Sequence, residues 1–389
     1  MAVFLFGGGI AEALRHSKRS VHPKCVARDH ALIIVAPISH QNRTMAVTIF
    51  LCAIRKVTKL AFAAVLTFCP AFGVLAAEGP AQQTVNPQFL KPASARKFSI
   101  EYIAKISEVP AGAKELRVWL PVPQNSTVQS IDELSFSSTP KLGSESKYGN
   151  RIAYWEFDAP KPLHEITMRF TCERKEIQVD LSRLASDGEA IPPEFSAFLQ
   201  PDRLVVVDDA IRKMAGDITK GKSTTLEKAR AIYDYVLAQM TYDKNHPGWG
   251  LGSTRHACAV GKGNCTDFHA LFNSLCRASG IASGFEIGLY LPYEKNSSEP
   301  MGGYHCWALF FVPGKTWVPV DCSEADRFPP RREYFFGSHT PNRVTLSTGR
   351  DIILNPPQQG EPLNYFLNPY AEADGKPVKT EKTWSFGNL

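Results

Sequence analysis

The spacing of apolar residues changes once along this chain of 389 residues, and that change limits which folds it can adopt. Between Phe98 and Glu173, short runs rich in β-branched and aromatic residues are separated by turn-forming clusters at even intervals. That pattern is typical of a β-sandwich of antiparallel strands. From about Ile191 onward the apolar residues recur at helical spacing instead. The sequence therefore predicts an α+β protein with a β-sandwich-like domain in front of a second, partly helical domain.

Individual elements can be placed within this outline. The clearest strand-like runs are FSIEYIAKI, ELRVWLPV, IAYWEF and EITMRFTCE. Thr224 and Glu227 have the spacing of a capping box, which predicts the start of a helix. Apolar residues then recur at helical intervals through Met240, and an earlier helix is predicted over 207–218. The chain is long enough for two domains of ordinary size, each with its own core.

The positive charge of the chain is concentrated at its N-terminus. The formal net charge of +6 would by itself suggest a nucleic-acid or membrane-surface partner. Residues 1–77, however, contain nine Lys and Arg residues against two acids, which leaves 35 basic and 36 acidic residues in the remainder. The remainder is thus near-neutral, and we expect no nucleic-acid partner for it.

The same N-terminal region has the composition of an export signal. Residues 60–77 are uncharged and apolar, follow Arg55, Lys56 and Lys59, and end in two alanines. A basic segment, an apolar segment and small residues at the exit characterise a cleavable signal peptide. Pro70 interrupts the apolar run, which disfavours the alternative of an uncleaved membrane anchor.

These observations set the boundaries at the front of the chain. Signal peptides begin at a chain start, so we interpret 45–77 as the signal peptide, with translation starting at Met45. Residues 1–44 are then a non-native extension, and a genuine but poorly structured extension is the alternative. Residues 78–96 are rich in Pro, Ala and Gln and are predicted to be a linker. We expect a secreted or periplasmic protein with no membrane contact beyond export.

The segment GKGNCTDFHALFNSLCRASG places Cys265 directly after a glycine-rich turn. Apolar residues at helical spacing follow, Asn264 is a favourable N-cap, and Gly280 is a favourable stop. Cys265 is therefore predicted to lie in the first turn of a helix. Unpaired N–H groups and the helix dipole stabilise a thiolate at that place, as a nucleophilic cysteine requires.

A strand pair is predicted downstream of this helix. Residues 304–312 and 316–322 read as two strands, joined by Pro313, Gly314 and Lys315. If those three residues form the loop, Val312 pairs with Thr316, and the numbers of all paired residues sum to 628. A slip of one residue would move every side chain to the opposite face.

This register brings a base and an acid together. His305 lies diagonal to Asp321 on the same face, at a separation of ~7–8 Å that longer side chains can bridge. Asp321 can then orient His305 and stabilise its charge, while the other ring nitrogen of His305 faces Cys265.

These residues carry a family resemblance. The cysteine in GNCTDFHALF, the histidine in YHCWA and the aspartate in WVPVD resemble, in order and spacing, the transglutaminase-like superfamily. Secreted bacterial members are similar in IYDYVLAQMTY, DRFPPRREYFFG and NRVTLSTGRDIILNPP. The resemblance covers about residues 190–370 as the catalytic domain, is weaker over the β-rich domain at 97–182, and leaves 371–389 as a C-terminal tail. It implies a papain-like core in which the helix carrying the cysteine packs on an antiparallel sheet.

The resemblance also implies a chemistry. Cys265 maps to the nucleophile, His305 to the general base and acid, and Asp321 to the orienting residue. The thiolate would attack a carbonyl of a peptide or protein substrate to form an acyl-enzyme, with an oxyanion hole and without a cofactor. The Cys265 backbone N–H is one expected oxyanion donor, and Tyr242 and Trp249 are candidates for a second.

The identity of the acyl acceptor stays open at this point. Hydrolysis, as in a cysteine protease or amidase, is preferred because no sequence feature indicates a dedicated amine site. A transglutaminase that cross-links protein glutamines and a non-catalytic binding or scaffold protein that kept the fold are the alternatives.

Other interpretations of the cysteines remain. A zinc site is one, since the residue types are suitable, but the spacing matches no strong zinc pattern; its ligands would be His256, Cys258, Cys265 and His269. A buried structural thiol is another interpretation of Cys265. In the predicted register Cys306 and Cys322 lie directly opposite, so a disulfide between them is one hypothesis and two free buried thiols the other.

Overall fold

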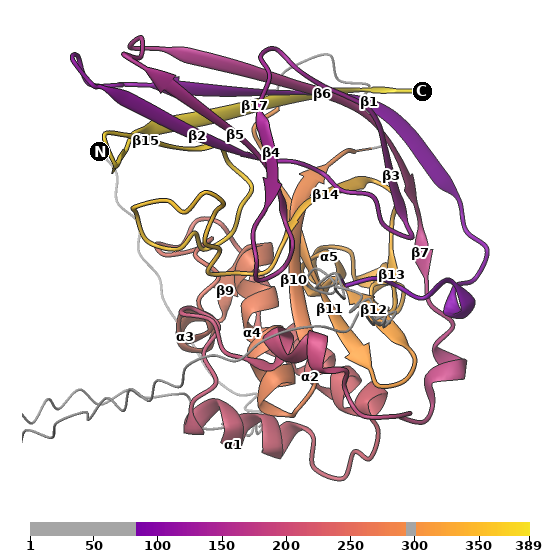
Figure 1. The fold of residues 1–389 in the computed structure, drawn as a ribbon. Helices are drawn as coiled ribbons and strands as arrows, with labels where there is room; N and C mark the ends of the chain where they lie inside the picture. Colours follow the sequence, from indigo (N-terminus) through magenta and orange to yellow (C-terminus); the bar gives the residue numbers. More distant parts are fainter. Residues whose placement is uncertain (1–82, 293–300) are drawn as a thin grey trace, which may run out of the picture. The chain divides into compact units, whose positions relative to one another are not determined.

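The computed structural model describes residues 83–292 and 301–389 (Figure 1). The expectations for 1–44, for 45–77 and for the start of the 78–96 linker fall outside these residues. The described part is a mixed structure, mostly sheet with few helices. Among its helices, none combines the length and the hydropathy of a transmembrane segment.

The β-rich front of the chain forms two antiparallel sheets. One has the strand order β17–β1–β6–β3 and the other β16–β15–β2–β5–β4. The first comprises β17 (Lys379–Asn388), β1 (Ala95–Ser107), β6 (His164–Lys175) and β3 (Gln129–Phe136). The second comprises β16 (Lys376–Pro377), β15 (Tyr370–Ala373), β2 (Glu115–Pro121), β5 (Arg151–Asp158) and β4 (Lys141–Ser144). Alternate residues of β1 are buried, as expected for strands with one face on a core.

The predicted C-terminal tail over 371–389 is corrected by this arrangement. β15 pairs with β2, and β17 pairs with β1 from Phe98–Asn388 to Ser107–Lys379. The end of the chain, yellow in Figure 1, therefore completes both sheets of the β-rich front. Trp384 and Phe386 enter the same apolar core as β1, because alternate residues of β17 face inward.

The second part is built on the antiparallel sheet β12–β11–β10–β14. Its strands are β12 (Thr316–Val320), β11 (His305–Val312), β10 (Ser283–Tyr290) and β14 (Arg343–Thr348). Helix α4 (Cys265–Ala278) packs on β11 and β10. The helices that surround α4 are α1 (Asp209–Ile218), α2 (Thr225–Gln239), α3 (Thr254–Val260) and α5 (Cys322–Arg327). Because sheet and helices enclose α4, its residues 265–277 are all buried.

Short elements complete the described chain. Two-stranded pairs join β7 (Ile177–Gln178) to β13 (Ser338–His339) and β8 (Thr241–Tyr242) to β9 (Lys262–Gly263). The 3-10 helices are η1 (Pro87–Phe89), η2 (Leu181–Leu184), η3 (Pro193–Leu199) and η4 (Pro329–Arg331).

The described part of the predicted linker, residues 83–96, packs against the folded core. Val85 and Phe89 are buried in the core shared with α4 and β11, and the Asn86 backbone N–H donates to the Thr316 hydroxyl at 2.8 Å. Val85 and Phe89, with Leu90 packed against the same core, account for this docking, because burying them removes their surface from water.

Candidate active site

Cys265 is the first residue of α4, as the sequence predicts. The Asn264 side chain accepts a hydrogen bond from the Thr266 backbone N–H, and the Asp267 carboxylate accepts one from the Asn264 backbone N–H, which makes a capping box. Gly263 allows this arrangement, since a Cβ there would lie 2.4 Å from a carboxylate oxygen of Asp267. The thiol therefore lies at the positive end of a well-capped helix, where negative charge is favoured.

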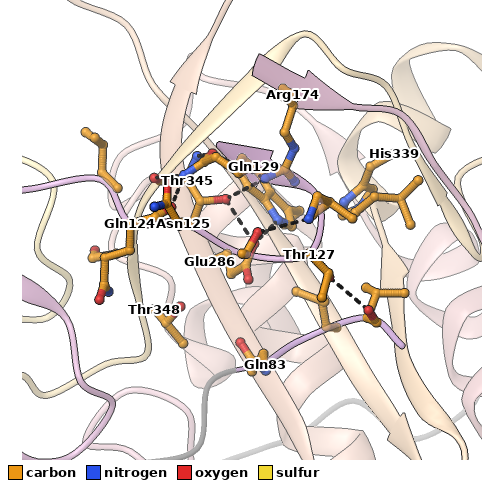
Figure 2. Close-up of a pocket in the computed structure, with 18 of the residues that line it drawn as sticks. Gln83, Gln124, Asn125, Thr127, Gln129, Arg174, Glu286, His339, Thr345 and Thr348 are labelled. Atoms are coloured by element: carbon orange, nitrogen blue, oxygen red, sulfur yellow. Dashed lines mark hydrogen bonds between the residues drawn. The ribbon is translucent and has the colours of Figure 1, made fainter. Parts of the chain in front are cut away.

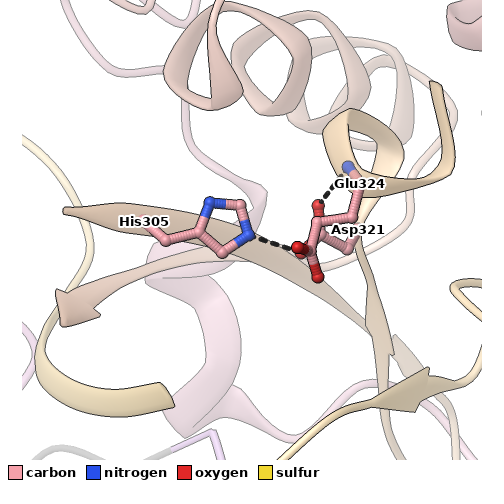
Figure 3. Close-up of side chains that lie close together, drawn as sticks. All are labelled: His305, Asp321 and Glu324. Atoms are coloured by element: carbon pink, nitrogen blue, oxygen red, sulfur yellow. Dashed lines mark hydrogen bonds and ion pairs between the residues drawn. The ribbon is translucent and has the colours of Figure 1, made fainter. Parts of the chain in front are cut away.

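His305 and Asp321 meet at the far ends of β11 and β12. His305 is the first residue of β11, and Asp321 follows directly after β12. Figure 3 shows the His305 ring facing the Asp321 carboxylate, with Nε2 2.6 Å from Oδ2. Both side chains are buried, so the charge-assisted bond between them is little weakened by water.

The predicted strand register is confirmed, but only as far as Val320. Pairs run from Val312–Thr316 to Ala308–Val320, and each sums to 628. The chain then leaves the sheet, because Asp321 caps α5 by accepting the Glu324 backbone N–H at Oδ1, 3.0 Å away. The contact with His305 is made from a helix cap and not from a diagonal strand position.

Cys265 and His305 are joined by a side-chain hydrogen bond. Since Nε2 of His305 faces Asp321, the other ring nitrogen is the one available to the thiol. The structure therefore brings together the three residues that the sequence singles out.

The electrostatics of this group favour a thiolate and an imidazolium. Burial by itself raises the pKa of the Cys265 thiol, but hydrogen bonds from Cys306 and His305 and the charge of His305 outweigh burial and lower the pKa to about 5. Burial lowers the pKa of His305, but the charge and hydrogen bond of Asp321 and the bond to Cys265 raise it to about 10. Asp321 is held well below its usual pKa because His305 and Arg343 outweigh its burial.

Arg343 is a member of this site that the sequence analysis missed. It lies on β14, is fully buried, and pairs with Asp321 Oδ2 at 3.2 Å and with Glu324 Oε2 at 3.1 Å. His305, Asp321 and Glu324 could offer ligand atoms to a metal (Figure 3), but the Arg343 guanidinium already provides a cation to both carboxylates. This cluster is therefore organised as an ion-pair network.

Of the two interpretations of Cys306 and Cys322, the structure contains the pair of free buried thiols and not the disulfide. Cys322 begins α5 instead of extending β12, so the strand pairing that would place it opposite Cys306 is lost. The His269 ring lies between them, with Nδ1 3.7 Å from Cys306 Sγ and Nε2 3.1 Å from the Cys322 backbone nitrogen.

The two oxyanion candidates differ in position. Tyr242 lies on β8 and packs near Phe268, at 6.3 Å between ring centroids. Burial raises the pKa of its hydroxyl, which keeps the proton available for donation, and the charge of Cys265 contributes to the raised pKa. Trp249 is 39% exposed and its ring faces the ammonium of Lys244. Of the two candidates, Tyr242 is the one that interacts electrostatically with Cys265.

The residues of the alternative zinc site are not brought together. Within the described residues, His256, Cys258, Cys265 and His269 form no cluster of ligand atoms. The His256 ring lies beside His246, at 5.7 Å between centroids, while His269 contacts Cys306.

A separate polar cavity of about 50 Å³ lies where the β-rich front meets the core sheet (Figure 2). Arg174 of β6 donates to the Thr345 hydroxyl, and Glu286 accepts from Thr345 and from the Trp307 indole N–H at 2.7 Å. Ligand pockets usually measure ~300–1,000 Å³, so this cavity has the size of a few water molecules. It connects the front sheet to the strand that carries His305, and none of the three site residues lines it.

Comparisons with known proteins agree with this geometry. Residues 212–322, which include Cys265, His305 and Asp321, match the model of the transglutaminase-like superfamily. An uncharacterised protein of Haemophilus influenzae is 26% identical over 315 residues, which is 70% of this chain and 85% of the relative.

One solved structure shows a similar fold. A candidate cysteine protease from Cytophaga hutchinsonii superposes with a TM-score of 0.54 at 17% identity, over 76% of this chain and 92% of its own. The periplasmic domain of TgpA from Pseudomonas aeruginosa gives a TM-score of 0.35 at 15% identity, over 63% of this chain and 93% of its own. Residues 212–322 of this chain therefore match the core model of the transglutaminase-like superfamily, and a β-rich region precedes them.

Proposed function

We propose that this chain is an exported thiol enzyme that attacks peptide or carboxamide carbonyls through Cys265. One observation carries the proposal: the Asp321 carboxylate lies 2.6 Å from Nε2 of His305, which leaves the other ring nitrogen available to Cys265. A carboxylate bound to one nitrogen fixes the tautomer and orientation of the imidazole, which then exchanges protons with the nucleophile at the other.

The opposite pKa shifts of Cys265 and His305 give the resting state of the reaction. The thiolate adds to the carbonyl carbon, and the carbonyl oxygen becomes an oxyanion. Backbone N–H groups at the start of α4 and the Tyr242 hydroxyl would donate to that oxyanion. His305 then passes its proton to the leaving amine as the carbon–nitrogen bond breaks, which leaves a thioester on Cys265.

Water completes the cycle in the reaction that we favour. His305, now neutral, takes a proton from water, the hydroxide adds to the thioester, and the Cys265 thiolate leaves. We favour hydrolysis because water needs no dedicated binding site, whereas an amine acceptor does. The apolar run over 60–77 and its preceding basic residues support action outside the cytoplasm, in the periplasm or in the medium.

The test is capture of the acyl-enzyme. We expect wild-type protein mixed with a protein digest and quenched in acid to carry an acyl group on Cys265, located by mass spectrometry. Cys265→Ala should carry none, whereas Cys276→Ala, which removes another buried thiol of α4, should behave as wild type. A wild-type protein without adducts or new peptide ends would favour the binding or scaffold alternative.

The same experiment separates hydrolysis from transfer. In isotopically labelled water with a primary amine added, a hydrolase puts the labelled oxygen into each new carboxylate. A cross-linking transglutaminase attaches the amine to glutamine side chains instead, and that product would overturn our preference for hydrolysis.

A further inference from the structure

We propose that Cys306 donates its S–H to the Cys265 thiolate, and that His269 is a positioning residue that fixes the direction of this bond. The inference rests on the proposed function, since it concerns the same nucleophile. It gives a role to two residues outside the Cys265–His305–Asp321 group.

The Cys322 backbone N–H determines which ring nitrogen of His269 carries the proton. The Cys322 backbone N–H can only donate, and its acceptor is His269 Nε2 at 3.1 Å. Nε2 therefore carries no proton. Burial lowers the pKa of His269 to about 4, so at neutral pH the ring is neutral and its one proton is on Nδ1.

The next link is the Cys306 thiol. His269 Nδ1 lies 3.7 Å from Cys306 Sγ and, since it carries the proton, it can only donate toward this sulfur; His269 also makes a hydrogen bond with the Cys265 backbone. The Cys306 S–H remains available to donate. Cys265 lies one helical turn before His269, whose ring contacts Cys306, and is the acceptor for this proton. Burial, with the charge of Cys265, raises the pKa of Cys306, which therefore keeps its proton.

The positions of His269 and Cys306 in the fold explain why these hydrogen bonds to Cys265 can form. His269 follows Cys265 by one helical turn, so both side chains project from the same face of α4. Cys306 follows His305 on β11, which packs on α4. Other titratable groups also interact electrostatically with Cys265, and they are His305, Tyr242, Tyr304 and Tyr365.

His305 and Cys306 would then have different roles toward the nucleophile. His305 supplies the charge and the proton for the leaving group, while Cys306 stabilises the thiolate with a bond that does not depend on the protonation of His305. A hydrogen bond to a charged group shifts a pKa by about one to two units. A less basic thiolate is also a weaker nucleophile, so Cys306 trades intrinsic reactivity for a larger thiolate fraction at low pH.

The test is the pH dependence of iodoacetamide alkylation at Cys265, followed by site-resolved mass spectrometry. Cys306→Ala should move the midpoint upward by about one to two pH units, and its rate constant on the alkaline plateau should not fall. Cys306→Ser, whose hydroxyl can donate in the same direction, should restore most of the shift. Cys276→Ala serves as the control, because it removes a buried thiol of the same helix that bonds to Ser283 instead of to Cys265.

His269→Leu gives an independent second measurement. It should shift the midpoint in the same direction as Cys306→Ala, and the double variant should shift no further than Cys306→Ala alone. A folded Cys306→Ala with the wild-type midpoint overturns the inference, and so does Cys306→Ser behaving like Cys306→Ala. Should Cys306→Ala fail to fold, an unshifted midpoint in His269→Leu overturns it.

Failure of the proposed function would give a different alkylation result. In that case the wild-type protein itself alkylates with the midpoint of an ordinary cysteine, near pH ~8.5.

Discussion

Replacing Arg343 should destabilise the folded protein strongly, although Arg343 contacts neither Cys265 nor substrate in the proposed mechanism. Its guanidinium lies between Asp321 and Glu324, and all three side chains are buried. Changing Arg343 to Met keeps much of the side-chain length but leaves two buried carboxylates with His305 as a partner for one of them. The protein should therefore lose stability.

The size of the loss follows from the distances. Two unit charges 3.1–3.2 Å apart, as Arg343 is from each carboxylate, attract by about 5 kcal/mol at an effective dielectric constant of ~20. Removal of the guanidinium also removes its own desolvation cost of several kcal/mol. The free energy of unfolding should fall by about 3–5 kcal/mol, as is typical when one partner of a buried ion pair is lost.

Urea denaturation at neutral pH measures this loss, and a double variant provides the control. Arg343→Met combined with Glu324→Gln removes one charge of each sign, so it should be less destabilised than Arg343→Met alone by about 1–3 kcal/mol. Arg343→Lys keeps the charge but cannot reach both carboxylates with a planar fork, so its stability should be intermediate. A loss below about 1 kcal/mol for Arg343→Met, or simple additivity in the double variant, would refute the reasoning.

Two further predictions concern turnover. kcat/KM should rise as the pH passes about 5, where the Cys265 thiolate forms, and should fall as it passes about 10, where His305 loses the proton that it gives to the leaving amine. Steady-state kinetics across pH check this, and an acid limb near pH ~8 would contradict the ion pair. Tyr242→Phe should lower kcat by on the order of 100-fold with little change in KM, because it removes an oxyanion donor. Trp249→Phe should leave kcat close to wild type, and equal losses in the two variants would contradict the assignment.

The parts of the fold that follow from local signals were predictable from sequence. The capping box at Thr224 and the stop at Gly280 are both present, and Cys265 begins its helix as expected. These signals act over one or two helical turns, and the backbone groups that they satisfy belong to the same segment. The place of Cys265 at a capped helix N-terminus could therefore be inferred from about twenty residues of sequence.

Features that depend on distant partners were not predictable. Residues 370–388 contain few apolar positions, because β16 is exposed and β17 has one polar face. Their sequence alone therefore resembles an unstructured tail, and their strands form by pairing with the distant β1 and β2. Arg343 alternates with the buried Val344 and Leu346, which in a strand with one wet face would place it in solvent. Its buried partners are Asp321 and Glu324, which follow β12 at the other end of the strand order, and no local pattern indicates them.

The assumed β11–β12 register suggested one contact that the structure contains and one disulfide that it lacks. The two differ in how large an error in the register they tolerate. The assumption was that the pairing continues beyond Val320, whereas the chain turns into α5 there. A hydrogen bond between His305 and Asp321 survives that error, because both side chains rotate and reach several ångströms, and it forms from the helix cap. A disulfide between Cys306 and Cys322 does not survive it, because it requires a Cα separation of about 4.4–6.8 Å and aligned Cβ atoms. Contacts between long polar side chains can thus be inferred from an approximate register, whereas covalent links between short side chains need the register to hold at the residue itself.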